Sequence, residues 1–133
     1  MERIDIGDYL VIAELHTGID ATTLARMPSL VALAQAALAA PFAGFGDFEA
    51  FPLFYEKAAI YCARVVTYHA LPDGNKRTGY DVMREFIARN GRSFAHPPAG
   101  LDETATVIEN LAGGTLSEAD FTAWMRDRID KPE

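Results

Sequence analysis

The sequence has a single cysteine and no long apolar segment. Cys62 has no second cysteine with which to form an internal disulfide, so we expect a buried small hydrophobic residue rather than a reactive thiol. No apolar run approaches the roughly 20 residues that a membrane helix needs, and no membrane partner is expected. Residues 1–5 lack the basic and then apolar pattern of a secretory signal, which favours the cytoplasm.

Positive charge is also scarce. The chain has 12 Lys and Arg against 19 Asp and Glu, a net charge of -7, whereas broad binding to nucleic acid needs a basic face. No direct nucleic acid partner is expected, although a local basic pocket is compatible with this balance. No internal repeat is visible. At 133 residues, half of them apolar, the chain is long enough for one core but not two, which predicts a single domain.

The rest of the pattern is mostly helical, and the fold class that we predict is all-α. Apolar residues at helical spacing or high helix propensity predict about six helices, over residues 4–15, 29–40, 52–68, 75–90, 101–111 and 117–129. Pro41 stops the second run, Gly91 fits the end of the fourth, and Ser117 is a candidate cap for the last. Pro97 and Pro98 mark a linker.

Residues 41–51 interrupt this helical pattern. They contain Gly44, Gly46 and phenylalanines at positions 42, 45, 48 and 51. From the residues alone, the segment is a packed loop or a short hairpin.

Between two predicted helices, the ten residues from His69 to Thr78 bring together an imidazole, a carboxylate, a glycine, an amide and two cations. Gly74 and Asn75 have the composition of a turn that enters a helix. Backbone N–H groups in the first turn of a helix have no partner within it, and the helix dipole adds partial positive charge there. Phosphate oxygens therefore bind well at such a helix start.

The charged residues of this run suit a polyphosphate. Lys76 offers a compact charge and Arg77 a planar pair of donors, so they can bind different phosphate oxygens. Asp73 would repel phosphate unless a cation lay between them, and Mg²⁺ is commonly held by carboxylates together with phosphate oxygens. Histidine is the side chain that changes its charge most readily near neutral pH, which makes His69 a candidate base.

Each of these residues also has a simpler interpretation. Taken alone, His69 would be a packing or capping residue and Asp73 the N-cap of the following helix. Lys76 and Arg77 would be solvated surface charges. Taken together, they favour a ligand, because cations in a first helical turn are electrostatically misplaced unless an anion binds there.

The run from His69 to Arg77 resembles the signature of the Fic/Doc family, His-x-Phe-x-Asp/Glu-Gly-Asn-Gly/Lys-Arg. Lys76 is similar to the residue of the Doc branch, the toxin half of bacterial toxin–antitoxin pairs. Residues 51–59 and 86–91 resemble the segments that open the preceding helix and close the following one. The similarity therefore covers most of the chain.

This resemblance implies a compact Fic fold over residues 1–133. Residues 69–77 would be the active-site motif, and residues 41–51 would be a flap that aligns the target protein beside it. The family uses ATP as co-substrate and Mg²⁺ as cofactor, and it modifies a protein hydroxyl. The implied catalytic set is His69 as base, Asp73 as magnesium ligand, Asn75 and Arg77; the implied nucleotide-binding set is Gly74, Asn75, Lys76 and Arg77.

Some positions depart from the pattern of the family members that transfer AMP. Leu71 replaces the usual Phe, which exchanges one apolar anchor for another. Lys76 fills the place of a second glycine, and Tyr80 stands where those members have a second Arg. Doc-like members with these features transfer the terminal phosphate instead. Phosphoryl transfer from ATP to a protein hydroxyl is therefore the leading hypothesis.

Other functions stay open. Adenylyl transfer (AMPylation) to a protein hydroxyl is the alternative within the family, and a catalytically silent module that binds nucleotide or protein is an alternative of another class. A metal-dependent hydrolase built on His69 and Asp73 is disfavoured. A zinc site usually needs more protein ligands than these, and the sequence has no other His or Cys cluster at ligand spacing.

The resemblance also implies partners. Thr106 to Asn110 is the nearest approach to the family's inhibitory Ser/Thr-x-x-x-Glu-Gly/Asn pattern, but its spacing is wrong, so a separately encoded antitoxin is expected. Doc-type toxins act on elongation factor Tu, which makes that protein a candidate substrate. His16 and His96 are expected at loops or helix ends away from the motif and are assigned no role.

Overall fold

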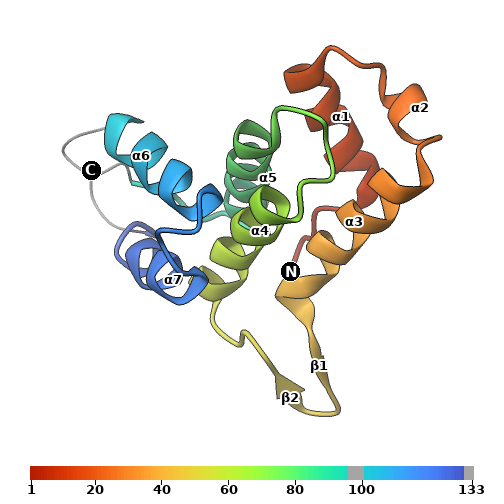
Figure 1. The fold of residues 1–133 in the computed structure, drawn as a ribbon. Helices are drawn as coiled ribbons and strands as arrows, with labels where there is room; N and C mark the ends of the chain where they lie inside the picture. The colour runs from red at the N-terminus through yellow and green to blue at the C-terminus, as the bar shows by residue number, and fades with distance from the viewer. Residues whose placement is uncertain (96–100, 131–133) are drawn as a thin grey trace.

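Helices α4 (Phe54–Tyr68) and α5 (Asn75–Arg89) lie at the centre of the fold, with the other helices around them (Figure 1). The structure is a computed structural model that describes residues 1–95 and 101–130, apart from the side chains of residues 101 and 102. The other described elements are α1 (Ile6–Thr17), α2 (Ala21–Leu24), α3 (Pro28–Ala39), the 3-10 helix η1 (Ala40–Phe42), β1 (Gly44–Phe45), β2 (Phe48–Glu49), α6 (Leu101–Ala112) and α7 (Glu118–Arg126).

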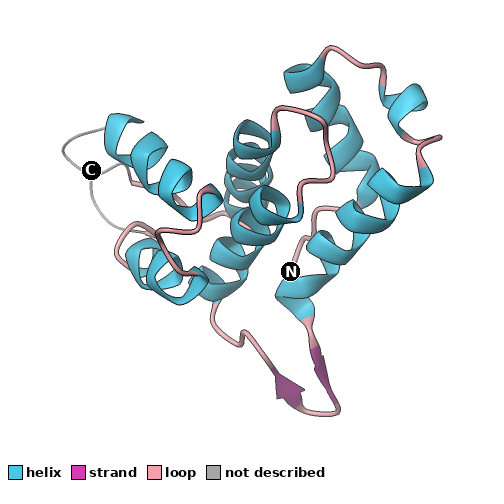
Figure 2. Cartoon of the chain, in the orientation of Figure 1, coloured by secondary structure: helices cyan, strands magenta, loops and turns pink. Residues whose placement is uncertain are grey.

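Apart from one small hairpin, the regular structure of the described residues is helical (Figure 2), which confirms the all-α prediction. The sequence predicts about six helices, and the additional one is α2, whose four residues are too few for a helical period to be visible. The predicted linker at Pro97 and Pro98 lies outside the described residues, as does His96. In the described part of the chain, no helix combines the length and the apolar character that crossing a membrane would require.

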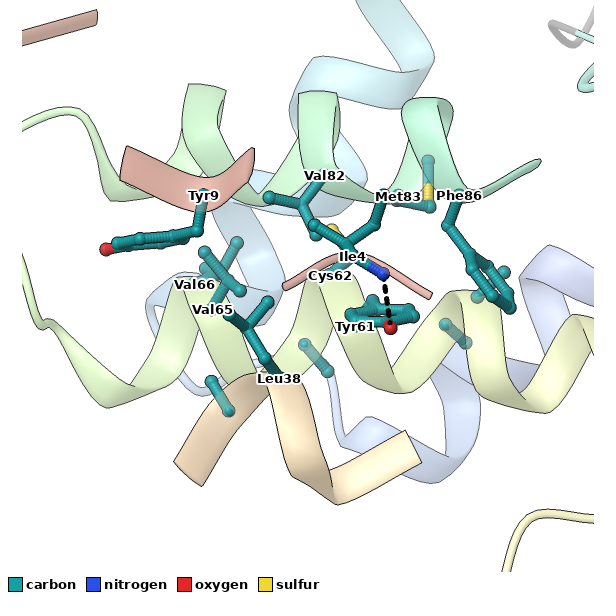
Figure 3. Close-up of a cluster of buried hydrophobic side chains, with 14 of the residues drawn as sticks. Ile4, Tyr9, Leu38, Tyr61, Cys62, Val65, Val66, Val82, Met83 and Phe86 are labelled. Atoms are coloured by element: carbon teal, nitrogen blue, oxygen red, sulfur yellow. Dashed lines mark hydrogen bonds between the residues drawn. The ribbon is translucent and has the colours of Figure 1, made fainter. Parts of the chain in front are cut away.

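Helix α4 is central because nearly all of its faces are buried. It contacts α3, α5, α6 and α7, and its buried residues run from Lys57 to Val66 with the exception of Arg64. The rings of Tyr61 and Phe86, on α5, have their centroids 4.8 Å apart. The Tyr61 hydroxyl accepts a hydrogen bond of 3.1 Å from the backbone N–H of Ile4 (Figure 3), which joins the N-terminal segment to the core.

The spacing between α4 and α5 depends on small residues. Cys62 is fully buried, and burial raises the pKa of its thiol to about 12, so the prediction of a buried small hydrophobic residue is confirmed. A Cβ added at Gly79 would lie 2.6 Å from Cγ2 of Val66 and 3.1 Å from the carbonyl oxygen of Cys62. The lack of a side chain at Gly79 therefore lets α5 pack closely on the helix that carries the first residue of the motif.

Residues 41–51 form the end of η1 and then a hairpin, in which Gly44 pairs with Glu49 and Phe45 with Phe48. Of the two predicted alternatives, a packed loop or a short hairpin, the structure has the hairpin. Both of its strands are exposed rather than packed. Its base is attached to α4 through Lys57, which is only 3% exposed. The Lys57 ammonium donates hydrogen bonds to the Phe51 carbonyl oxygen and to Glu49, the latter at 3.1 Å.

Candidate active site

The motif occupies the short loop between α4 and α5 and the first turn of α5. His69 is the C-cap of α4 with φ 51° and ψ 47°, and Gly74 is the N-cap of α5 with φ 84°. Both are left-handed conformations, which cost a glycine little but are uncommon for other residues. Uncommon backbone conformations of this kind concentrate at functional sites, and here they turn the chain at either end of the loop.

Asn75 holds this loop closed. Its Oδ1 accepts a hydrogen bond of 3.1 Å from the backbone N–H of Leu71, and its Nδ2 donates one of 2.9 Å to the Leu71 carbonyl oxygen. The Leu71 side chain is buried at 3% exposure, as expected of the apolar anchor that replaces Phe. Asn75 therefore positions the loop, whatever further contact it makes with a ligand.

The loop and the start of α5 border a cavity of about 770 Å³, within the range of roughly 300–1,000 Å³ that small-molecule sites occupy. The structure places all of the predicted site residues around it. The cavity is lined by His16 of α1, by Val66 and His69 at the end of α4, by Pro72, Asp73, Gly74, Asn75, Lys76, Arg77, Tyr80 and Asp81, and by Thr104, Ala105, Ile108, Glu109 and Ala112 of α6.

The two groups predicted to do the chemistry are both accessible. His69 and Asp73 are exposed, and neither side chain has a hydrogen-bond or ion-pair partner among residues 1–95 and 101–130. The simpler interpretation of Asp73 as the N-cap is wrong, because Gly74 takes that position without any side-chain cap. The simpler interpretation of His69 is right for its backbone, which ends α4, while the imidazole lines the cavity.

The two cations of the motif have different surroundings. The Lys76 ammonium lies 3.1 Å from Oε1 of Glu109 on α6, a contact between residues so distant in the sequence that the motif alone could not reveal it. Arg77 is exposed and has no hydrogen-bond or ion-pair partner within the part of the chain that the structure describes. The basic entrance to α5 therefore includes one cation paired with an acid and one without a partner.

Helix α6 supplies a wall that sequence reasoning missed. Ala105, Ile108 and Ala112 give this wall an apolar character, which suits a nucleoside. Thr104 is only 2% exposed, and its hydroxyl is buried without a hydrogen-bond partner. A buried polar group is normally paired, and the Thr104 hydroxyl is one of the exceptions.

The expectation that His16 lies away from the motif is wrong. Nε2 of His16 lies 2.5 Å from Oδ2 of Asp81 on α5, and both residues line the same cavity as the motif. The Cβ and carbonyl oxygen of His16 would be 3.4 Å from a Cβ at Gly74, so the end of α1 packs directly against the turn. No local sequence pattern indicates this contact, because His16 and Asp81 are 65 residues apart.

The described residues contain one exposed carboxylate at the start of α5, that of Asp73. Within the described residues, no group of three or more His, Cys, Asp or Glu side chains is arranged to hold a metal ion. Mg²⁺ needs fewer protein ligands, because phosphate oxygens and water complete its octahedral shell. The exposed carboxylate of Asp73, beside the start of α5, fits this mode of binding.

The fold and the site together define a class, an all-α bundle whose central helix pair presents an imidazole, a carboxylate and a basic helix entrance to one cavity. The family model described as the Fic/DOC family matches residues 11–87, more than half of the chain, and the protein belongs to this family. A curated relative, the Toxin Doc of Mycolicibacterium smegmatis, is 38% identical over 63 residues, which are 47% of this chain and 48% of that protein. The match thus spans about half the length of the relative.

Proposed function

We propose that this protein is a Doc-like toxin that transfers a phosphoryl group from ATP to a hydroxyl of a protein. One observation carries the proposal: an accessible imidazole and an accessible carboxylate, those of His69 and Asp73, line the same cavity as the basic N-terminus of α5. These are the parts that phosphoryl transfer requires, since the protein contributes mainly positioning and charge stabilisation.

The triphosphate would bind at the first turn of α5. Backbone N–H groups after Gly74 point toward this turn's open end, and the Arg77 guanidinium offers two donors to phosphate oxygens. Lys76 would exchange Glu109 for a phosphate oxygen. Asp73 would hold Mg²⁺, which neutralises charge on the phosphates when it is bound.

His69 would act as the general base. Its imidazole takes the proton of the target hydroxyl, whose oxygen then bonds to the γ-phosphorus. The bond between that phosphorus and the oxygen bridging the β- and γ-phosphates breaks, so that ADP leaves and a phosphorylated side chain remains. General-base catalysis of this kind contributes on the order of 10²- to 10⁴-fold to a rate.

Two residues favour phosphoryl over adenylyl transfer. Lys76 occupies the position of a second glycine, and Tyr80 the position of a second arginine, in the pattern of the members that transfer AMP. In the structure, the Tyr80 hydroxyl accepts a hydrogen bond of 2.7 Å from Arg84, and the Tyr80 side chain lines the cavity. The cavity thus has a phenol where the AMP-transferring members have a guanidinium.

The hairpin is the candidate docking element for the target. Phe45 and Phe48 are 78% and 57% exposed, and a hairpin edge can pair with an extended segment of another protein. By the family resemblance, elongation factor Tu is the first target to test. The name of the M. smegmatis relative supports a toxin, and a separately encoded antitoxin in the same cytoplasm is the partner to expect.

The type of reaction can be tested with purified protein, Mg²⁺ and ATP labelled either in the γ-phosphate or in the adenine. We expect label from the γ-phosphate alone on a protein in a cell lysate, and on purified elongation factor Tu. Label from adenine alone would establish adenylyl transfer instead. Tight binding of Mg-ATP with no transfer to any protein would select the catalytically silent module.

The role of His69 can be tested in the same assay. Because its imidazole is exposed and unbonded, His69→Ala should lose transfer by about 10²- to 10⁴-fold while the circular dichroism spectrum is unchanged. His69→Asn is the matched control for backbone strain, since Asn adopts the left-handed region more readily than Ala. Full transfer by a folded His69→Ala protein would remove the assignment of His69 as base.

A further inference from the structure

Arg77 and Asp81 are four residues apart on α5, the spacing at which opposite charges on a helix meet. The same helix forms such a pair one turn beyond Asp81, where Nε of Arg89 lies 2.9 Å from Oε1 of Glu85. Arg77 and Asp81 do not pair: among the described residues, Arg77 has no ion-pair or hydrogen-bond partner. The carboxylate that would neutralise the guanidinium is engaged elsewhere.

His16 engages it. The contact of 2.5 Å between Nε2 of His16 and Oδ2 of Asp81 directs the carboxylate toward the end of α1. The His16 side chain is well covered, at 16% exposure, and the Asp81 side chain is 37% exposed. Close packing of His16 on Gly74 keeps the imidazole next to the turn and beside Asp81.

The neighbouring arginine does not substitute for His16. Arg84 follows Asp81 by three residues, but its guanidinium donates to the Tyr80 hydroxyl at 2.7 Å and lies 5.2 Å from the centroid of the Phe94 ring. Two other acids line the cavity: Glu109 contacts Lys76, and Asp73 precedes the N-cap Gly74, so it does not lie on α5. Asp81 is therefore the nearby carboxylate placed by helix geometry to pair with Arg77.

We propose that His16 is a positioning residue that, by holding Asp81, keeps the Arg77 guanidinium unpaired and available to the anion that binds at the start of α5. The identity of that anion as a nucleotide phosphate rests on the proposed function. The pairing between His16 and Asp81, and its effect on Arg77, do not. Removal of the His16 donor would release the Asp81 carboxylate to pair with Arg77. The negative charge of Asp81 would then face the incoming phosphates.

The first test needs no nucleotide. Phenylglyoxal reacts with accessible guanidinium groups, and the rate at Arg77 can be followed by mass spectrometry of the peptide that contains it. We expect His16→Leu, which keeps side-chain bulk beside Gly74 but has no donor, to lower this rate by about twofold to fivefold, the range given by exposed ion pairs. His16→Gln keeps an N–H donor and should react as the wild type does.

The decisive variant combines His16→Leu with Asp81→Asn. Without the Asp81 carboxylate, α5 has no acid one turn beyond Arg77 to pair with it, so the double variant and Asp81→Asn alone should label at the wild-type rate. If His16 only anchored α1 to α5, Arg77 in the double variant would be labelled at least as slowly as in His16→Leu. An unchanged rate in folded His16→Leu, or no recovery in the double variant, would overturn the proposal. If His16→Leu did not fold, as judged by circular dichroism, His16→Ala would take its place.

The second test titrates the same variants with Mg-ATP. His16→Leu should weaken binding by a factor similar to its loss of labelling, and the double variant should recover it. Absence of any Mg-ATP binding by the wild type would overturn the proposed function, while the labelling experiment would still decide the role of His16. A third outcome is that labelling slows in His16→Leu and recovers in the double variant, while the affinity for Mg-ATP stays the same in all variants. This outcome would show that Arg77 is kept unpaired but does not contact the nucleotide, and would refute the proposal that the anion at Arg77 is a nucleotide phosphate.

Discussion

The ammonium of Lys76 lies 3.1 Å from a carboxylate oxygen of Glu109, so a residue of α6 pairs with one of the two cations of the motif. Both side chains are at least half exposed, at 50% and 65%, and the pair is therefore readily broken by a competing anion. Glu109 also adds a negative charge to a cavity that already contains Asp73 and Asp81. Glu109 would therefore oppose the binding of the proposed nucleotide in two ways.

Replacement of Glu109 by Gln should consequently strengthen the binding of Mg-ATP by about twofold to fivefold, since an exposed ion pair of this kind is worth little more. Isothermal titration calorimetry at low and high salt would measure the effect, which should shrink as salt screens the charges. Glu85→Gln is the matched control, because it removes an exposed, ion-paired acid from α5 without touching this cavity. Weaker binding by Glu109→Gln would contradict the competition.

The motif could be predicted from the sequence because its groups are contiguous. His69, Asp73 and Arg77 lie within ten residues of one another, and the turn chemistry of Gly74 announces the helix start on which they are arranged. The helices were predictable for the same reason, since each depends on a local period. Short α2 was missed because four residues contain hardly more than one period.

The rest of the site is assembled by tertiary packing. His16 and Glu109 reach the cavity from α1 and α6, and nothing within either helix distinguishes them from ordinary surface residues. Thr104 is similar, because a threonine in a helix is notable only once its hydroxyl is found buried without a partner. Such contacts depend on how α1 and α6 pack against α5, which local patterns do not contain.

Gly79 provides a test of the close packing between the central helices. Helix propensity alone would make Gly79→Ala stabilising by about 1 kcal/mol, but the new Cβ would lie 2.6 Å from Val66 and 3.1 Å from a backbone oxygen. Overpacking of this kind costs about 1–3 kcal/mol. We expect a net loss of about 1 kcal/mol and a melting temperature lower by roughly 4 °C.

Gly7→Ala is the matched control for this substitution. Gly7 also lies in a helix, and an added Cβ would meet only Oδ1 of Asp5, at 3.3 Å. Its melting temperature should be equal to or above that of the wild type. A higher melting temperature for Gly79→Ala as well would mean that α4 and α5 can separate without cost.

Acid should weaken the attachment of α1 to α5. The hydrogen bond from Arg89 lowers the pKa of Asp8 from 3.8 to about 2, through a two-pronged contact of 2.9 Å and 3.0 Å. Because the pKa is lower in the folded state, the ionised carboxylate stabilises the fold above the unfolded value and this contribution is lost as the pH falls from about 4 toward 2.

Urea unfolding at pH 6 and at pH 3 would measure this contribution. We expect Asp8→Asn to lose less stability than the wild type between these two values, because its side chain does not titrate. Asp120→Asn on α7 serves as a control for acids in general, since Asp120 is an exposed residue of a first helical turn. Equal losses in the wild type and in Asp8→Asn would show that the Arg89 contact does not perturb the carboxyl.

Lys57 should matter for the protein substrate more than for ATP. Its buried ammonium bonds Glu49 and the Phe51 carbonyl oxygen, which fixes the hairpin to the N-terminal part of α4, at the opposite end of this helix from His69. Lys57→Met keeps the apolar stem but removes both bonds, so the hairpin should lose its orientation. We expect a KM for the protein target raised by about tenfold, the cost of removing one buried partner from a polar contact, with Mg-ATP affinity unchanged.

Phe45→Ser, which alters the exposed tip without loosening its base, should raise the same KM only if the tip itself contacts the target. A Lys57→Met protein that lost ATP affinity instead would indicate that the lysine supports the cavity rather than the hairpin.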